Sequence, residues 1–133
     1  MNRGSVVFRH EVKYHISERE AYVLAQYFRR IMRPDKHAGL DGQYWIRSLY
    51  FDTPGNRDYL DKVDGYTERR KIRLRIYDTT TDTAMLEQKK KRGAFVHKES
   101  MPLDRQNASK LVNGDWRFLP FQSPGAAHQF YAC

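Results

Sequence analysis

Along residues 6–16, apolar or aromatic side chains alternate with charged ones. A period of two predicts a β-strand that buries one face and exposes the other. The exposed face of this predicted strand carries Arg9, Glu11, Lys13 and His15. The strand therefore presents a dense set of charges on one side.

Three further segments have the pattern of strands. Residues 44–52 are rich in aromatic and β-branched side chains. Residues 66–77 alternate again, and residues 84–91 follow after a polar turn. Gly93 then marks a hairpin that returns through residues 94–100. Within the second and third of these segments, the charged faces carry Lys71, Arg73, Arg75 and Tyr77, and then Glu87, Lys89 and Lys91.

Helical signals lie between and after the strands. A capping-box pattern, with Ser17 as N-cap and Glu20 three residues on, predicts a helix with one apolar stripe that ends before Pro34. Pro54 is predicted to be the first residue of a short helix. Asp104 is predicted to cap a last helix. These elements indicate an α+β fold in which helices cover one face of an antiparallel sheet.

The composition sets limits on this picture. A chain of 133 residues, 40% of them hydrophobic and 14% aromatic, fits one ordered domain over 1–133 with an irregular tail at 114–133. It contains no run of about 18 apolar residues, so no transmembrane helix is expected. The N-terminus does not have the pattern of a secretory signal. The single cysteine, Cys133, excludes a disulfide framework, and a cytoplasmic location is expected.

The charge is concentrated in one part of the chain. Ten basic and three acidic residues lie between Arg69 and Lys98, so this stretch carries nearly all of the net charge of +8. Like charges that face each other across strands destabilise a sheet. Such a concentration therefore favours an anionic partner that offsets the repulsion.

The residue types agree with a phosphate-rich partner. Arginine presents planar, multi-donor contacts to phosphate oxygens, and lysine presents mobile point charges. Two readings are open for the acids Glu11 and Glu87. They are either ligands of a hard divalent ion, Mg²⁺ or Mn²⁺, or partners that relieve crowding among neighbouring lysines.

Five segments occur in an order that resembles a known family. They are Arg9-His-Glu11-Val-Lys13-Tyr14, SLYFDT at 48–53, RRKIRLRIY at 69–77, LEQKKK at 86–91, and Lys98. Over about residues 8–100 the chain resembles the VTC domain, the polyphosphate polymerase branch of the triphosphate tunnel metalloenzyme (CYTH-like) superfamily. The resemblance implies an antiparallel β-tunnel with flanking helices. It also implies metal-dependent transfer of the γ-phosphate of ATP to a polyphosphate chain.

The resemblance assigns roles to individual residues. Phosphates would be held for catalysis by Lys13, Arg73, Arg75, Lys89 and Lys98. Arg9 and Lys91 would take part in binding the nucleotide or polyphosphate, and Glu87 and Glu11 would lie near the Mn²⁺ or Mg²⁺ ion. Lys98 shares its parity with Val96, so we expect a bulge or a change of register before it.

Two departures from the family pattern shape the expected function. The first-strand motif has Arg9 where the wider superfamily has glutamate, which favours the polymerase branch over the triphosphatases. Only four or five strands are predicted, against about eight in a small closed barrel. The chain is therefore interpreted as the N-terminal part of a tunnel domain, whose exposed sheet edges favour self-association.

Three other functions are kept as alternatives. A non-catalytic module that binds polyphosphate or another polyanion is favoured by the incomplete tunnel. A triphosphatase of the same superfamily would use the same cations. A nucleic-acid-binding domain would account for the basic charge, but the sequence shows no known nucleic-acid motif.

Overall fold

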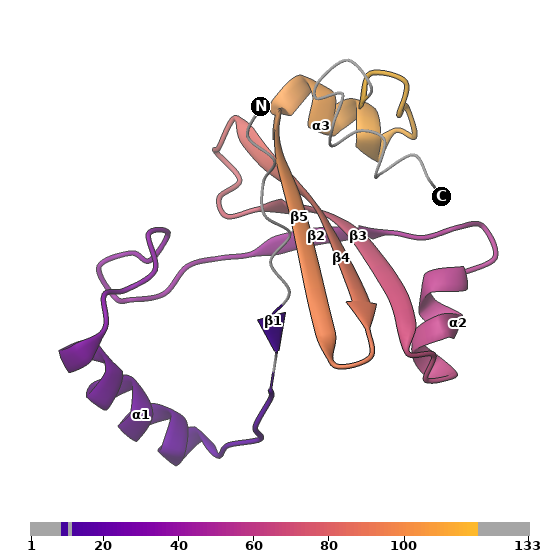
Figure 1. Cartoon of the computed structure of the whole chain (residues 1–133). Coiled ribbons are helices and arrows are strands. Elements are labelled where there is room, and N and C mark those ends of the chain that lie inside the picture. Colours follow the sequence, from indigo (N-terminus) through magenta and orange to yellow (C-terminus); the bar gives the residue numbers. More distant parts are fainter. Residues whose placement is uncertain (1–8, 11, 120–133) are drawn as a thin grey trace, which may run out of the picture. The chain divides into compact units, whose positions relative to one another are not determined.

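In the computed structural model, residues 9–10 and 12–119 are described, and they fall into two compact units with boundaries after His10 and after Trp45. The first unit holds a sheet and two helices, and the second holds one helix (Figure 1). The elements in chain order are β1 (Arg9–His10), α1 (Glu18–Ile31), β2 (Arg47–Phe51), α2 (Arg57–Val63), β3 (Glu68–Ile76), β4 (Thr83–Arg92), β5 (Phe95–Asp104) and α3 (Arg105–Val112). The predicted α+β class is confirmed.

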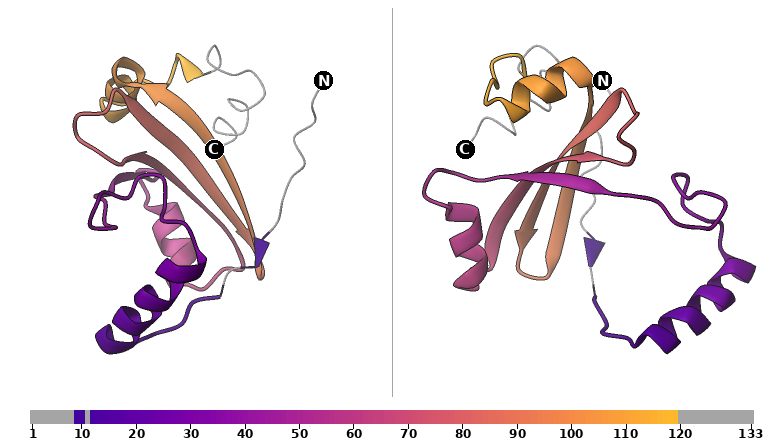
Figure 2. Two further views of the ribbon diagram at one scale, coloured as in Figure 1. Left: turned by 90° about the vertical axis from the view of Figure 1, so that its left-hand side faces the viewer. Right: turned by 180° about the vertical axis from the view of Figure 1, so that it is seen from behind.

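The sheet is antiparallel throughout, with strand order β1-β5-β4-β3-β2. Strands β3, β4 and β5 form its centre as a meander of sequential hairpins, and the sheet is twisted in both views of Figure 2. The two edges, β1 and β2, do not pair with each other in the described part of the chain, so this sheet is open.

The first strand is shorter than the sequence pattern predicts. Within the predicted strand 6–16, only Arg9 and His10 are assigned to β1, and residues 12–16 have no regular structure. Residues 6–8 and 11 lie outside the described part. The prediction of a continuous strand is therefore wrong for residues 12–16. An alternating pattern alone cannot supply a neighbouring strand, and in the described part of this segment two residues of β1 pair with β5.

The hairpin of β4 and β5 runs in one unbroken register from Thr83–Asp104 to Arg92–Phe95. Gly93 opens the two-residue turn with a φ of 57°, a left-handed conformation that glycine adopts without strain. Lys98 lies directly opposite Lys89 in this register. The prediction of a bulge or register change before Lys98 is therefore wrong. Val96 lies on the same side of β5 as Lys98, and the register between β4 and β5 does not change.

The core lies on one face of the meander, beneath α3. Leu86 of β4 and Leu103 of β5 are fully buried, and Leu111 of α3 packs into the same cluster. The remaining buried members are Ile72, Leu74, Ala84, Met101, Ala108 and Leu119. The alternation seen in the sequence thus puts one parity of β3, β4 and β5 into this core.

Helix α2 begins later than predicted. Its first residue is Arg57, not Pro54, and its N-cap Asn56 has a left-handed φ of 54°. The carboxylate of Asp52 accepts backbone N–H bonds from Asp58 at 2.9 Å and from Tyr59 at 3.0 Å. This carboxylate therefore caps the first turn of α2 from the end of β2, which places the start of the helix beyond the proline.

Helix α3 begins where the sequence predicts. The Asp104 side chain accepts the backbone N–H of Asn107 at 2.7 Å, as an N-cap residue does. Helices α2 and α3 both lie against the same face of the sheet, since Asp58 pairs with Arg70 while Leu111 joins the core. The opposite face is covered by neither of these two helices.

The second unit contains α1. The predicted capping box is confirmed, because Ser17 and Glu20 exchange side-chain and backbone hydrogen bonds of 3.3 Å and 2.7 Å. The apolar stripe of α1 includes Leu24 and Phe28, and no residue of this helix is buried. Within the described residues, none of the helices has the length and apolar character that a bilayer span requires.

Candidate functional site

One face of the sheet gathers the charged residues and is called the charged face below. Alternation along β3, β4 and β5, together with the observed register, brings eight charged side chains to this face. Seven are basic and one is acidic: Arg69, Lys71, Arg73, Arg75, Lys89, Lys91, Lys98 and Glu87. The sequence prediction that the charged residues of β3 and β4 share a face is therefore confirmed.

A row of three lysines crosses the charged face. Lys71 lies directly opposite Lys89, and Lys89 lies directly opposite Lys98. Since neighbouring strands are about 4.8 Å apart, such a row spans about 10 Å. Like charges opposed in this way cost stability, and an anion laid across the strands would offset that cost.

The one carboxylate that β3, β4 and β5 bring to the charged face, Glu87, lies in the row next to the lysines. Its side chain is 4% exposed. One carboxylate oxygen, Oε2, is 2.6 Å from Nε of Arg73 and 3.8 Å from Nε of Arg75. The other oxygen, Oε1, forms an ion pair with Nζ of Lys98. Glu87 is therefore the centre of a cluster of three cations drawn from β3 and β5.

These contacts set the protonation of Glu87. Burial alone would raise the pKa of this carboxyl group, but hydrogen bonds from Lys98 and Arg73 outweigh the burial and hold the pKa below its usual value. Glu87 is thus a stable anion at neutral pH.

Strand β2 adds two hydroxyl groups that the sequence analysis did not select. Nη1 of Arg73 donates to the Tyr50 hydroxyl at 3.2 Å, and Nε of Arg75 donates to Ser48 Oγ at 3.3 Å. The hydrogen bond from Arg73 lowers the pKa of Tyr50. Tyr50 and Ser48 were missed because aromatic residues occupy both parities of 44–52. Only the register, which pairs them with Arg73 and Arg75, shows which side they share.

The other predicted site residues have different positions. Lys91 is half-buried in the next row of the charged face, opposite Arg69. The backbone of Arg9 pairs with Val96, which itself pairs with Lys91, so the register places Arg9 at the end of that row. Lys13 is exposed in the second unit, outside any strand, so its role in the site stays a prediction. Glu11 lies outside the described residues.

The predicted metal ligands do not form a metal centre in the described part of the chain. No group of three or more His, Cys, Asp and Glu side chains that could hold a metal occurs there. Both oxygens of Glu87 already contact cations. Glu87 in this arrangement therefore does not fit a resident Mn²⁺ or Mg²⁺ ion. The divalent ion remains a prediction.

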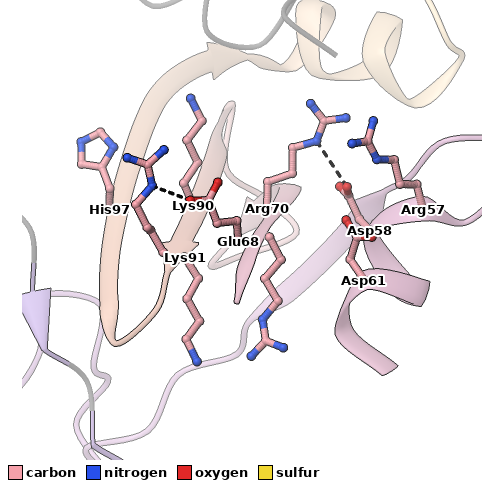
Figure 3. A pocket seen from close by; sticks show the side chains of 10 residues that line it. Arg57, Asp58, Asp61, Glu68, Arg70, Lys90, Lys91 and His97 are labelled. Atoms are coloured by element: carbon pink, nitrogen blue, oxygen red, sulfur yellow. Dashed lines mark hydrogen bonds and ion pairs between the residues drawn. The ribbon is translucent and has the colours of Figure 1, made fainter. Parts of the chain in front are cut away.

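A pocket of about 490 Å³ lies between α2 and the strand ends near the β4–β5 turn, and it differs from the charged face in its charge balance. Figure 3 shows the head groups of Arg70 and Lys90 pointing to one side of it and that of Lys91 pointing to the other. Three of the six lysines and arginines that line it form the ion pairs Arg70–Asp58 at 3.3 Å, Arg92–Glu68 at 3.0 Å and Lys90–Glu99 at 4.0 Å.

The pocket is less basic than the charged face. Six lysines and arginines and three carboxylates line the pocket, whereas β3, β4 and β5 bring seven cations and one carboxylate to the charged face. Arg69 and Lys91 belong to both. The candidate site for a polyanion is therefore the charged face.

A pH dependence of stability follows from the lowered pKa of Glu87. In the unfolded chain this carboxyl group protonates near its ordinary value of 4.5, and in the folded chain it protonates at lower pH. Its contribution to stability is therefore complete above about pH 4.5 and is lost as the pH falls through the lower folded value.

We expect the free energy of unfolding of the wild-type chain, measured with denaturant, to fall below pH 4.5 through this loss. The Glu87→Gln variant should not show this part of the decrease. Parallel stability curves for the two proteins below pH 4.5 would contradict the assignment.

The described part of the chain is thus an α+β domain whose open antiparallel sheet has helices on one side and clustered cations on the other. A comparison with protein families gives a match to the VTC domain over residues 8–130, which is most of the chain. The chain therefore belongs to the VTC domain family, and it is a polyphosphate-related domain of the tunnel type. No curated protein matches the chain significantly.

Proposed function

We propose that the charged face binds polyphosphate and that the domain transfers the γ-phosphate of ATP to a growing polyphosphate chain. The observation that carries this proposal is the row of Lys71, Lys89 and Lys98, directly opposed on three strands beside Arg73 and Arg75. A row of like charges that lowers the stability of the sheet is explained if a chain of phosphates lies across it. Membership of the VTC family supports polyphosphate as that chain.

The residues of the cluster have distinct roles in the proposed reaction. The guanidinium groups of Arg73 and Arg75 hold phosphate oxygens, and Tyr50 and Ser48 fix their orientation. The lysines neutralise charge that builds up on the transferred group. Such a reaction is catalysed mainly by positioning and electrostatic stabilisation.

The chemical step needs no nucleophile from the protein. A terminal oxygen of the acceptor chain attacks the γ-phosphorus in line and forms a new P–O bond. The bond between the γ-phosphorus and the β–γ bridging oxygen breaks, and ADP leaves with that oxygen. The acceptor chain is then one phosphate longer.

A second candidate function is binding of polyphosphate without turnover. It is favoured by the open sheet, because the described strands number five and a small closed barrel takes about eight. Binding and turnover can be separated by experiment, since both need the charged face and only turnover consumes ATP.

The proposal is tested by calorimetric titration with tripolyphosphate in the presence of Mn²⁺ at near-physiological salt. Single-stranded DNA of the same total charge serves as the control ligand. We expect saturable tripolyphosphate binding and weak DNA binding. In a separate assay with ATP, we expect release of ADP as polyphosphate forms. Equal and strongly salt-dependent binding of both ligands would instead indicate a general polycation surface and would overturn the proposal.

A further inference from the structure

The position of Glu87 within the cation cluster points to a role other than metal binding. Its carboxylate presents two anionic oxygens to Arg73 and Lys98, with Arg75 at 3.8 Å from the nearer oxygen. These are the contacts that an incoming phosphate group would make with the same cations. The carboxylate thus occupies the place of a bound anion.

We propose that Glu87 is an internal counter-ion that competes with phosphate for Arg73, Arg75 and Lys98, and that this competition selects long polyphosphate chains over short phosphate anions. The inference rests on the proposed function, in that it takes polyphosphate as the ligand of the charged face. It adds the residue that sets the selectivity for chain length.

The selectivity follows from how far the charged face extends beyond Glu87. A short anion such as pyrophosphate can reach only a few cations, and the cluster that would hold it best already contains a carboxylate. A long chain also reaches Lys71 in the lysine row and Arg69 and Lys91 in the adjacent row, and the ion pairs of Glu87 with Arg73, Arg75 and Lys98 include none of these three. Repulsion from a single carboxylate is therefore a larger fraction of the binding free energy for the short anion.

The burial of Glu87 supports its role as a permanent part of the cluster. The side chain is 4% exposed, and its two oxygens are enclosed by the cations that they contact. By contrast, Glu68, on the opposite parity of β3, is exposed and pairs only at the surface with Arg92. These two glutamates therefore form a matched pair for a test, since both changes remove one negative charge.

The experiment compares the wild-type chain with Glu87→Gln and with the control Glu68→Gln. Binding of pyrophosphate and of a polyphosphate of several tens of phosphates is measured by calorimetry, with and without Mn²⁺. We expect Glu87→Gln to bind pyrophosphate about tenfold more tightly and the long chain less than about threefold more tightly. Glu68→Gln should leave both affinities within about twofold of wild type.

The outcomes separate this inference from the proposed function. Unchanged or weaker pyrophosphate binding by folded Glu87→Gln overturns the counter-ion role. If Glu87→Gln binds pyrophosphate more weakly than wild type only when Mn²⁺ is present, Glu87 is a metal ligand, and the counter-ion role is also overturned. A wild-type chain that binds no long polyphosphate overturns the proposed function itself.

A second variant covers the case in which Glu87→Gln does not fold, which thermal unfolding will show. Glu87→Asp keeps the charge but draws the carboxylate back by one methylene group from Arg73 and Lys98. We expect it to bind pyrophosphate between about twofold and fivefold more tightly than wild type. No gain in this variant would also overturn the inference.

Discussion

Replacing Arg73 and Arg75 together by glutamine is expected to weaken tripolyphosphate binding by at least about 100-fold, as calorimetry would measure. The two guanidinium groups are half-buried on the charged face, and each is held by a hydroxyl group of β2. Hydrogen bonds to charged groups contribute about 1.5–3 kcal/mol each, so losing two such anchors accounts for the size of the effect. Glutamine is preferred to alanine because it leaves a donor beside the buried Glu87.

A control variant with the same change in charge isolates the position of the arginines. Arg57 and Arg92 are exposed and line the pocket on the α2 side of the sheet. The double variant Arg57→Gln, Arg92→Gln also removes two positive charges, and we expect it to lose less than about fivefold in affinity, because exposed charges are screened by salt. Similar losses in the two double variants would show that only net charge matters and would contradict the proposed site.

Leu86→Ala is expected to lower the free energy of unfolding by about 3 kcal/mol, within the usual range of about 2–5 kcal/mol for such a change. Leu86 is fully buried at the centre of β4, between Leu74 and Met101 on the neighbouring strands. The α3 helix covers this face, so the remaining side chains cannot easily close the cavity.

The neighbouring residue provides the comparison for this prediction. Met85 points to the opposite side of the same strand and is only half-buried. Met85→Ala should therefore cost less than about 1.5 kcal/mol in the same denaturant titration. Equal losses for Leu86→Ala and Met85→Ala would mean that the core is not on the side of α3.

The parts of the fold that the sequence predicts well are those where local pattern and tertiary packing agree. In β3 and β4 the alternation is strict, and the apolar parity meets α3, so Ile72 and Leu86 are buried as the pattern requires. The caps at Ser17 and Asp104 are also local, since each side chain bonds to a backbone group three residues away.

The wrong predictions of secondary structure have a common physical cause: these elements depend on residues that are distant in the sequence. The strand predicted through Lys13 needs a neighbour along its whole length, and of its described residues two, Arg9 and His10, pair with β5. The start of α2 depends on Asp52, which captures N–H groups six and seven residues away. Spacing rules for neighbouring residues predict neither the strand pairing nor the contacts of Asp52.

The candidate site shows the same division. Parity alone placed Arg73, Arg75 and Glu87 on one side of the sheet. The ion pair of Glu87 with Lys98 and the hydrogen bond of Arg73 to Tyr50 depend on the register between strands, which parity does not determine. Sequence reasoning thus found most of the cations but not the pairs that they form.

The meander of β3, β4 and β5 also affects how the molecule folds. Because the three strands follow one another along the chain, their pairing is local, and local pairing is typical of rapid folding. When these strands pair, Lys71, Lys89 and Lys98 come to lie opposite one another before any ligand is present. Electrostatic repulsion therefore adds to the folding barrier, and dissolved counter-ions or a polyanion lower that barrier by screening. A ligand that binds this face thus also acts as a template for the hairpins that create it.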